Sequence, residues 1–517
     1  MNQLERFRFA LAKDTHLGNL MERLAKTNGD APLVEEAETG LKLTFEEAAD
    51  RVAGTAGGIR ARIEPGDRVV INAPNGYDFF LLCLAAMRAG AVAVPVNPQM
   101  RDEEVEYVKK DSGATITVHS CDEVMGEPVE AAEATPEDVA GVFYTSGTTG
   151  KPKGAELSHK ALLGSGVMMA AYPAGLRRDE AVSGMPVAHI AGFSILLMVA
   201  CGGIPVYLLP KFRPDKALDA IEERRATLFV GVPAMYRMML EAGAEDRDLR
   251  SVRLWASGAD VMPQDLIRKF KRMGAMATLP VVGASVGEAA FVDGYGMVEL
   301  GGGVAIRFSL PMMNLPIGSN VVTPLPGYHL KVIGDDGNEV RLGQVGELVV
   351  KGPGVMRGYH GQEDATKETL TEDGWLRTGD LARKGPFGLV EFAGRKKHVI
   401  KHGGYSVFAV EVERALEEHP AVVECAVIGL PDERKGEVPV AVVRLGDGDG
   451  VSEDELVSWA KEHMSDYKAP KQVKIVDDLP RTGTDKVQKD ELLKLFQDDE
   501  GDGDSGGKTD KAKSKDN

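Results

Sequence analysis

The chain has 517 residues, of which 43% are hydrophobic and 27% charged, an ordinary composition for a soluble globular protein and a length that suggests two or more domains. Its formal net charge of −18 argues against a nucleic-acid partner, because affinity for a phosphate backbone needs clustered lysine and arginine. The four cysteines (Cys83, Cys121, Cys201 and Cys425) lie far apart, which argues against a disulfide framework or a cysteine-based zinc site and fits a reducing cytoplasm.

The N-terminal segment carries scattered charges and no apolar core of signal-peptide length, so we expect a cytoplasmic protein. Thr44 and Glu47 form a capping-box pattern that opens a helix. Apolar runs at 68–73 and 91–96 predict strands, and the segment 77–88 between them predicts a helix. Such strand–helix–strand units indicate parallel sheets covered by helices.

The segment 190–210 has no charged residue, a property that membrane spans share. Gly202, Gly203 and Pro205 interrupt it, so we favour a helix that ends at the glycines, followed by a buried strand over 204–209. We therefore predict no transmembrane segment, and peripheral contact with a membrane stays open.

The α/β pattern continues with a helix that begins at Pro214 and a strand over 227–232. After about residue 320 turn residues become more frequent, and the alternating run 347–351 indicates an antiparallel region.

A smaller α+β unit is predicted from about residue 399. It comprises a helix over 411–418, a strand over 424–429 and a helix that Ser452 and Glu455 would cap.

Residues 144–154 read YTSGTTGKPKG and directly follow the apolar run 139–143. The glycines let the backbone approach an anion closely, the hydroxyl groups can donate hydrogen bonds, and the lysines supply positive charge. A flexible surface turn has the same composition, so the indication of a phosphate loop depends on the full string.

This string resembles the signature loop of the adenylate-forming enzymes, which include acyl-CoA synthetases, the adenylation domains of peptide synthetases and beetle luciferases. The resemblance extends in order over nearly the whole chain, and it implies ATP, Mg²⁺ and coenzyme A as cofactor and substrates. It places Lys153 near the outer phosphates and Thr145 near magnesium. The other loop residues that it implies at the nucleotide are Ser146, Gly147, Thr148, Thr149 and Gly150.

The same resemblance divides the chain into an N-terminal AMP-binding adenylation domain (1–395) and a mobile C-terminal domain (396–497). The polar tail 498–517 lacks apolar residues, so we expect it to be disordered. The predicted fold class is α/β. The large domain should contain parallel and mixed sheets covered by helices plus a β-rich subdomain, and the small domain should be α+β.

Two further segments, SGA and DGYGMVE, resemble the adenine side of the family's site. Gly258 and Ala259 would leave room for a flat base against the backbone, although a plain strand-to-helix turn is an alternative. The resemblance packs Tyr295 on the adenine, with Gly294 and Gly296 beside it.

Glu299 ends the second segment and matches the family's magnesium ligand, a suitable role for a carboxylate. A glutamate in a surface turn is the alternative. The chain departs from the family at Val298, where a threonine hydroxyl normally contacts the phosphate; losing that hydrogen bond would cost on the order of 1 kcal/mol.

The segment VAHIAGF resembles the one whose histidine gates the acyl pocket, which points to His189; a satisfied core histidine is the alternative. The segment GWLRTGD resembles the family's ribose-binding string. The Asp380 carboxylate would therefore accept hydrogen bonds from both ribose hydroxyls, and Arg395 is expected near the ribose as well. Lys397 matches the hinge position.

Lys401, Gly403 and Gly404 match the segment that faces the nucleotide and the thiol after rotation of the small domain. His398 and His402 stand four apart, a spacing that binds metal on a helix, but the glycines and the strand-like 399–400 argue against a helix and therefore against a zinc site.

The segment 467–489 resembles the family's C-terminal motif and places the catalytic lysine at Lys486. A solvated surface lysine is the alternative in isolation. Asp485 stands where the family has glycine and adds a negative charge.

We therefore predict an AMP-forming acyl-CoA synthetase that activates a carboxylic acid, with Lys486, Glu299 and Lys153 as catalytic groups. A fatty acid is the first expectation and an aryl acid the alternative. An adenylation enzyme that loads a carrier protein, or a weakened non-catalytic homologue, also stays open, as does a homodimer.

Overall fold

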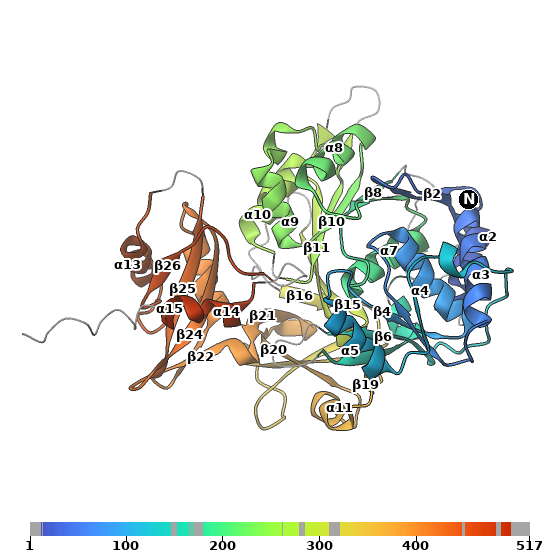
Figure 1. Cartoon of the computed structure of the whole chain (residues 1–517). Coiled ribbons are helices and arrows are strands. Elements are labelled where there is room, and N and C mark those ends of the chain that lie inside the picture. Colours follow the sequence, from blue (N-terminus) through green and yellow to red (C-terminus); the bar gives the residue numbers. More distant parts are fainter. Residues whose placement is uncertain are drawn as a thin grey trace, which may run out of the picture. The chain divides into compact units, whose positions relative to one another are not determined.

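The structure is a computed structural model that describes residues 12, 14–145, 152–164, 166, 169, 179–260, 262–278, 285–309, 321–446, 450–481 and 487–497 (Figure 1). It falls into two compact units, one of Met1–Thr378 with Ala382–Phe392 and one of Gly379–Leu381 with Ala393–Asn517.

The larger unit contains a six-stranded sheet with the order β19-β7-β6-β4-β3-β5. Its strands are β3 (Arg68–Ile71), β4 (Val92–Pro95), β5 (Ile116–Val118), β6 (Val139–Tyr144), β7 (Gly154–Ser158) and β19 (Gly358–Tyr359). Strands β5, β3, β4 and β6 are parallel, and β7 and β19 are antiparallel additions. Alternate residues face opposite sides: Val69 and Ile71 join one buried cluster, and Val70 joins another. Both faces of this sheet are therefore covered.

A thirteen-stranded sheet has the order β17-β18-β20-β21-β16-β15-β14-β11-β10-β8-β9-β1-β2. Its strands are β1 (Pro32–Glu36), β2 (Lys42–Thr44), β8 (Ala181–Ser183), β9 (Val206–Leu208), β10 (Leu228–Gly231), β11 (Leu254–Gly258), β14 (Ala290–Met297), β15 (Gly302–Ser309), β16 (Val321–Pro324), β17 (His329–Ile333), β18 (Val345–Lys351), β20 (Leu376–Lys384) and β21 (Val390–Arg395). The run from β1 to β14 is parallel, whereas β15 and β16 are antiparallel to their neighbours. A short hairpin is formed by β12 (Ala277–Thr278) and β13 (Ser285–Val286).

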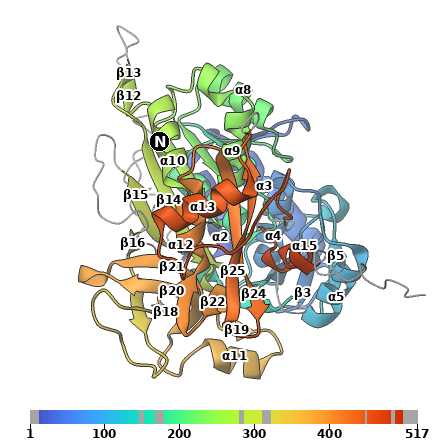
Figure 2. The same cartoon turned by 90° about the vertical axis from the view of Figure 1, so that its left-hand side faces the viewer.

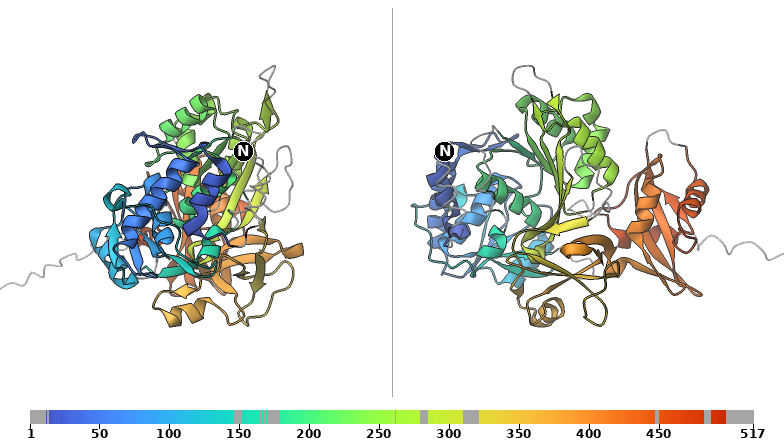
Figure 3. Two further views of the ribbon diagram at one scale, coloured as in Figure 1. Left: turned by 90° about the vertical axis from the view of Figure 1, so that its right-hand side faces the viewer. Right: turned by 180° about the vertical axis from the view of Figure 1, so that it is seen from behind.

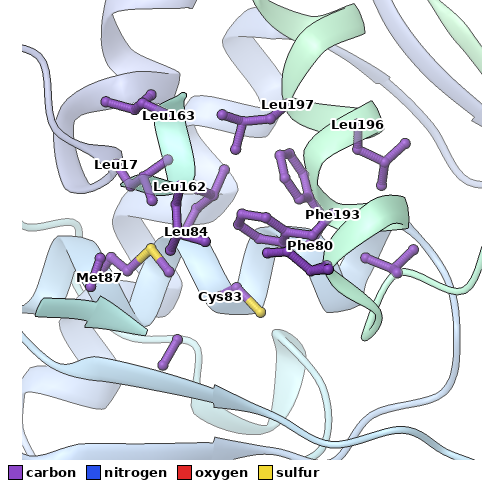
Figure 4. Close-up of a cluster of buried hydrophobic side chains, with 14 of the residues drawn as sticks. Leu17, Phe80, Cys83, Leu84, Met87, Leu162, Leu163, Phe193, Leu196 and Leu197 are labelled. Atoms are coloured by element: carbon purple, nitrogen blue, oxygen red, sulfur yellow. The ribbon is translucent and has the colours of Figure 1, made fainter. Parts of the chain in front are cut away.

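The helices of the larger unit are α2 (Leu17–Asn28), α3 (Phe45–Arg60), α4 (Tyr77–Ala89), α5 (Asp102–Ser112), α6 (His159–Leu163), α7 (Ile190–Gly202), α8 (Pro214–Arg224), α9 (Pro233–Glu241), α10 (Gln264–Met273) and α11 (Glu363–Thr369). Helices α2, α3 and α4 lie side by side (Figure 3). Around α4, Phe80, Cys83 and Leu84 pack with Leu162 of α6 and Phe193 of α7 (Figure 4). This core supports the segments that lead into the candidate site.

Most elements predicted from the sequence are confirmed, with ends shifted by one or two residues. The Thr44 hydroxyl accepts a hydrogen bond from the N–H of Glu47 (3.2 Å), whose carboxylate accepts one from the N–H of Thr44 (2.8 Å). Helix α7 ends at Gly202, where Gly203 takes a left-handed φ of 63°, and β9 follows. Among the described residues no helix is long and apolar enough to cross a membrane.

The alternating pattern of 347–351 is confirmed in one respect and wrong in another. Strand β18 pairs with β17 in the antiparallel sense, as predicted. Its consecutive residues 347–350 are nevertheless all buried, because β18 lies between β17 and β20 and is covered on both faces.

The smaller unit contains a sheet with the order β23-β22-β25-β24, and β26 also pairs with β25. Its elements are β22 (Val399–His402), β23 (Tyr405–Phe408), α12 (Ala409–Glu417), β24 (Val422–Asp432), β25 (Gly436–Leu445), α13 (Glu453–His463), β26 (Val473–Ile475), α14 (Lys489–Leu492) and α15 (Lys494–Gln497). Helices α12 and α13 pack together (Figure 2). Val427 faces their cluster, whereas its neighbours Ala426 and Ile428 face a cluster with Leu492 of α14, so this sheet is also covered on both sides.

Candidate nucleotide and acid site

The predicted phosphate loop connects the antiparallel strands β6 and β7. Thr145 follows β6, and its backbone N–H donates to the carbonyl of Lys153 at 2.9 Å, so these two predicted phosphate-side residues are adjacent. The loop residues Ser146, Gly147, Thr148, Thr149 and Gly150 lie outside the described residues. At Gly154 a Cβ atom would come within 2.6 Å of Val142, so this glycine is required by packing.

Tyr359 joins two of the predicted catalytic residues. Its hydroxyl donates to Glu299 Oε1 at 2.8 Å, and Lys153 Nζ lies 5.1 Å from the centre of its ring. Burial and the Glu299 carboxylate both raise the pKa of Tyr359, so the hydroxyl stays a proton donor near neutral pH. The sequence analysis missed this residue, because its strand β19 has only two residues and shows no periodic pattern.

The residues at this point fit a divalent cation. Glu299 is 7% exposed and lies in the short 3-10 helix η5 (Val298–Leu300), next to strand β7. Tyr359 engages one carboxylate oxygen, and a carboxylate has acceptor sites left on its second oxygen. Glu299 and the Thr145 hydroxyl offer hard oxygen ligands of the kind that Mg²⁺ prefers.

The predicted adenine-side residues meet through strand pairing. Strands β11 and β14 are parallel with Gly258 opposite Gly294, and a Cβ on Gly258 would lie 3.4 Å from the Gly294 carbonyl oxygen. Ala259 has a positive φ of 70°. At Gly296 a Cβ would lie 1.9 Å from a carbonyl oxygen of β15, so only glycine fits there. The ring of Tyr295 lies 6.4 Å from that of Phe392.

A buried ion pair lies behind this surface. Asp293 and Arg307 face each other on β14 and β15, and Arg307 Nη2 donates to Asp293 Oδ2 at 2.8 Å and to the Met262 carbonyl at 2.9 Å. Burial raises the pKa of Asp293 to about 6, against the opposing effect of Arg307. The pair fixes β15 against β14 directly beside Gly294.

His189 is the N-cap of α7, where its Nδ1 accepts the N–H of Ala191 at 3.2 Å. The neutral ring therefore carries its proton on Nε2. Ala191 also packs against a small apolar cluster. Ala259, one of the predicted adenine-side residues, packs against the same cluster. The cluster consists of buried Met185, Val232, Ala234 and Met235, with Ala191, Ile195, Phe212 and Ala259 packed against it. This cluster joins the His189 segment to the predicted nucleotide segment.

In the smaller unit, Asp380 and Arg395 lie side by side. Arg395 Nε lies 3.2 Å from Asp380 Oδ1, and Asp380 is 5% exposed. Lys397 lies in the 3-10 helix η7 (Lys396–His398). Its pKa is lowered mainly by burial and, to a smaller extent, by the positive charge of Arg395. Burial, assisted by Lys489 and other nearby cations, lowers the pKa of His398 to about 3.

Gly403 and Gly404 form a two-residue turn between β22 and β23. Both have a positive φ, 56° and 87°, the conformation that such tight hairpins require. Lys401 Nζ donates to the Ser406 hydroxyl at 3.0 Å. The segment containing His402 is a strand, as expected, and no group of three or more metal-binding side chains occurs among the described residues. Lys486 lies outside the described part of the chain.

The larger α/β unit with its threonine- and glycine-rich loop, followed by a small α+β unit, defines the chain as an adenylate-forming type of protein. The chain belongs to the AMP-binding enzyme family: the family profile matches residues 21–360, and the profile of the AMP-binding enzyme C-terminal domain matches residues 411–486. The predicted family and fold class are confirmed, and with the family come ATP and coenzyme A as substrates and Mg²⁺ as the usual metal.

Three curated relatives illustrate the similarity. The chain is 34% identical to a feruloyl-CoA synthase of an Amycolatopsis species over 504 residues, which cover 93% of this chain and 99% of the relative. It is 31% identical over 501 residues to a 2-succinylbenzoate–CoA ligase of Bacillus cereus, covering 92% and 98%. An indoleacetate–CoA ligase of Aromatoleum aromaticum is 36% identical over 356 residues, covering 68% and 66%.

Solved structures agree with this assignment. ATP-bound MatB from Rhodopseudomonas palustris has a TM-score of 0.81 and 29% identity, covering 94% of this chain and 99% of that chain. The o-succinylbenzoate CoA synthetase (MenE) from Bacillus subtilis, in complex with the acyl-adenylate OSB-AMP, has a TM-score of 0.79 and 26% identity, covering 92% and 97%.

Proposed function

We propose that this protein is an AMP-forming CoA ligase for a ring-bearing carboxylic acid, which it activates as an acyl-adenylate. The observation that carries the proposal is the joining of Lys153 and Glu299 by Tyr359 at the end of the phosphate loop. An ammonium group and a metal-binding carboxylate at one point suit a triphosphate, because the chemical step must bring two anions together.

In the first half-reaction a carboxylate oxygen attacks the α-phosphorus of ATP, the bond to the β-phosphate oxygen breaks, and pyrophosphate leaves. Lys153 would hold the outer phosphates, and Tyr359 would orient Glu299. Mg²⁺, when held by Glu299 and Thr145, neutralises charge on the phosphate oxygens. Lys486 would stabilise the charge on the α-phosphate and the attacking carboxylate.

In the second half-reaction the thiol sulfur of coenzyme A attacks the acyl carbon, the carbon–oxygen bond to AMP breaks, and the thiol proton passes to solvent. We propose that the smaller unit turns at Lys397 between the two steps, which would bring the turn of Gly403 and Gly404 to the thiol. Asp380 and Arg395 would hold the ribose throughout.

The choice of a ring-bearing acid rests on the relatives and on the apolar cluster. The acids for which the three relatives are named are ring compounds, so they favour the aryl alternative over the fatty acid that the sequence analysis put first. The cluster beside His189 contains Met185 and Met235, whose flexible thioethers make favourable contacts with aromatic rings.

A panel of acids tests this proposal by pyrophosphate exchange, which reports adenylate formation alone. Ferulate, 2-succinylbenzoate and indoleacetate should support exchange at least about tenfold better than acetate or palmitate, a difference of about 1.4 kcal/mol. A preference for palmitate would overturn the ring assignment. Absence of exchange with every acid would instead favour a weakened homologue, for which Val298 and Asp485 are the departures from the family pattern.

Transfer to free coenzyme A is tested separately. Thioester formation from acid, ATP and coenzyme A by the purified chain supports the ligase, whereas exchange without any thioester would favour a carrier-protein-loading enzyme.

A further inference from the structure

Asn75 is a half-buried amide in the loop between β3 and α4 that the proposed reaction does not use. Its Oδ1 accepts the N–H of Val187 at 2.8 Å, and its Nδ2 donates to the carbonyl oxygen of Pro210 at 2.6 Å. One partner therefore requires an acceptor and the other a donor. Aspartate and leucine have nearly the same shape, but aspartate lacks the donor and leucine lacks both groups.

This amide joins three segments that are distant in the sequence. Asn75 follows β3 of the six-stranded sheet, whereas Val187 and Pro210 follow β8 and β9 of the thirteen-stranded sheet. All three strands run parallel to neighbours in their sheets, so the amide lies beyond their carboxyl ends. Parallel sheets bind their ligands at this edge, so a residue that joins two sheets there is well placed to shape a substrate site.

The start of α4 holds Asn75 in place. The N–H of Tyr77, in the first turn of the helix, donates to the carboxyl group of Glu36 at 3.0 Å, and Glu36 is 6% exposed. A Cβ on Gly76 would lie 2.9 Å from the same carboxyl group, so the loop passes directly against it. The backbone that carries Asn75 is therefore fixed from the end of β1.

The turn 186–189 connects the partner of this amide to His189. The N–H of His189 donates to the carbonyl oxygen of Pro186 at 3.2 Å, and Val187 lies inside the turn that this bond closes. A Cβ on Gly192 would lie 2.1 Å from the same carbonyl oxygen, so the first turn of α7 rests directly on this peptide. Because the His189 ring is fixed to the start of α7 as its N-cap, a displacement of the Val187 peptide would move the ring.

Apolar packing joins α4 and α7 independently of the amide. Phe193 of α7 packs on Phe80 of α4 with ring centres 5.2 Å apart (Figure 4), and on Phe143 of β6 with ring centres 5.5 Å apart. These contacts keep α7 in place when the amide is removed. The loss of Asn75 should therefore affect the turn 186–189 and leave the core intact.

We propose that Asn75 is a positioning residue for the acid: it holds the Val187 peptide, and with it the turn that carries His189, in the conformation to which the acid binds. The inference rests on the proposed ligase activity and on the predicted place of His189 beside the acid. Affinity for the acid improves when the turn is already ordered, because ordering it then no longer opposes binding. The residues predicted at the outer phosphates, Lys153 and Glu299, lie on other segments.

Pyrophosphate exchange by Asn75→Leu provides the test. The KM values for acid and for ATP are measured with whichever of ferulate, 2-succinylbenzoate, indoleacetate and palmitate the wild-type protein uses best. The KM for acid should rise about tenfold, the value of one hydrogen bond, and the KM for ATP should stay within about twofold. A residue that served folding alone would lower the amount of active enzyme, and hence kcat, without this split.

An unchanged KM for acid, or an equal rise in both KM values, would overturn the proposal. Asn75→Ala only removes atoms and should give the same split, so it decides the matter where Asn75→Leu folds poorly. Asn28→Leu is the matched control, because Asn28 Nδ2 donates to the Leu24 carbonyl at 3.0 Å within α2. Removing this amide should change neither KM.

Asn75→Asp separates the two hydrogen bonds. It keeps an acceptor for the N–H of Val187 and loses the donor to Pro210, so the KM for acid should rise no more than about threefold. A rise as large as that of Asn75→Leu would overturn the route through Val187.

A double substitution tests the link to His189. Because Asn75 acts through the turn that carries His189, Asn75→Ala combined with His189→Ala should have the same KM for acid as His189→Ala alone. Increases that multiply would overturn the link.

The wild-type protein distinguishes the levels of the proposal. Absence of exchange with every acid would overturn the ligase assignment and this inference with it. Intact exchange with a native KM for acid in both Asn75→Leu and Asn75→Ala would overturn the role of Asn75 alone.

Discussion

At the scale of single residues, Tyr359 makes the sharpest prediction. Tyr359→Phe keeps the ring beneath Lys153 but removes the hydrogen bond to Glu299. We expect pyrophosphate exchange to slow about tenfold, because one hydrogen bond to a charged group is lost. The Mg²⁺ concentration for half-maximal rate should also rise, since the carboxylate is less well oriented.

Tyr207→Phe is the matched control, because its ring supports Arg224 in the same unit and takes no part in the site. A Tyr359→Phe enzyme with native rate and native Mg²⁺ dependence would show that the hydroxyl does not orient Glu299.

The site residues that the sequence analysis named lie in local sequence strings, whereas those that it missed depend on contacts between strands distant in the sequence. Lys153 and Glu299 lie in strings with a fixed local order, so resemblance identified them, and the structure brings both to Tyr359. Tyr359 reaches the site because its strand β19 pairs with β7, which lies about 200 residues earlier in the chain. Such a distant contact leaves no local pattern in the sequence. Arg307 was missed for the same reason, because its partner Asp293 lies on the neighbouring strand.

At the scale of elements, the capping box of α3 can be tested directly. Thr44→Ala leaves the N–H of Glu47 without its side-chain partner. We expect the free energy of unfolding to fall by about 1 kcal/mol, measured by urea denaturation of matched samples. Thr44→Ser retains the oxygen and should lose much less. Equal losses in the two variants would mean that the lost methyl contacts, and not the cap, explain the effect.

Elements with local signals were predicted well, and those defined by distant partners were not. The cap of α3, the glycine end of α7 and the apolar helix α4 follow from neighbouring residues. The strand order of the large sheet could not be read from the sequence, because β1 pairs with β9 across a long stretch of chain. The burial of β18 on both faces likewise depends on its neighbours in the sheet.

At the scale of the whole molecule, each of the two units has its own core, as the change of pattern along the sequence indicated. Consecutive residues in the middle of β24 and β25 are buried and alternately join two different clusters, which shows why the smaller unit needs helices on both faces. Its independent core is what a rotation between half-reactions would require. The rotation itself, like the roles of Lys397 and Lys486, is a proposal.

The stability of the larger unit should depend on acid through His159, which is 4% exposed and accepts the N–H of Leu17 on its Nδ1 at 3.1 Å. Burial, with a smaller effect of His16, lowers its pKa from 6.5 to about 4. The unfolded chain therefore binds a proton below pH 6.5 that the folded chain refuses until about pH 4. Stability is lost as the pH falls through this window, by about 2 kcal/mol between pH 7 and pH 5.

His159→Asn tests this sign, because an amide oxygen can still accept the N–H of Leu17 but cannot titrate. Urea unfolding at pH 7 and pH 5 should show a smaller loss in the variant than in the wild-type protein, by about 2 kcal/mol at most. His329→Asn, at an exposed position of β17, should leave the pH dependence unchanged. An equal loss in wild type and His159→Asn would assign the acid sensitivity to other groups, of which buried His16, whose pKa is also lowered by burial, is the next to test.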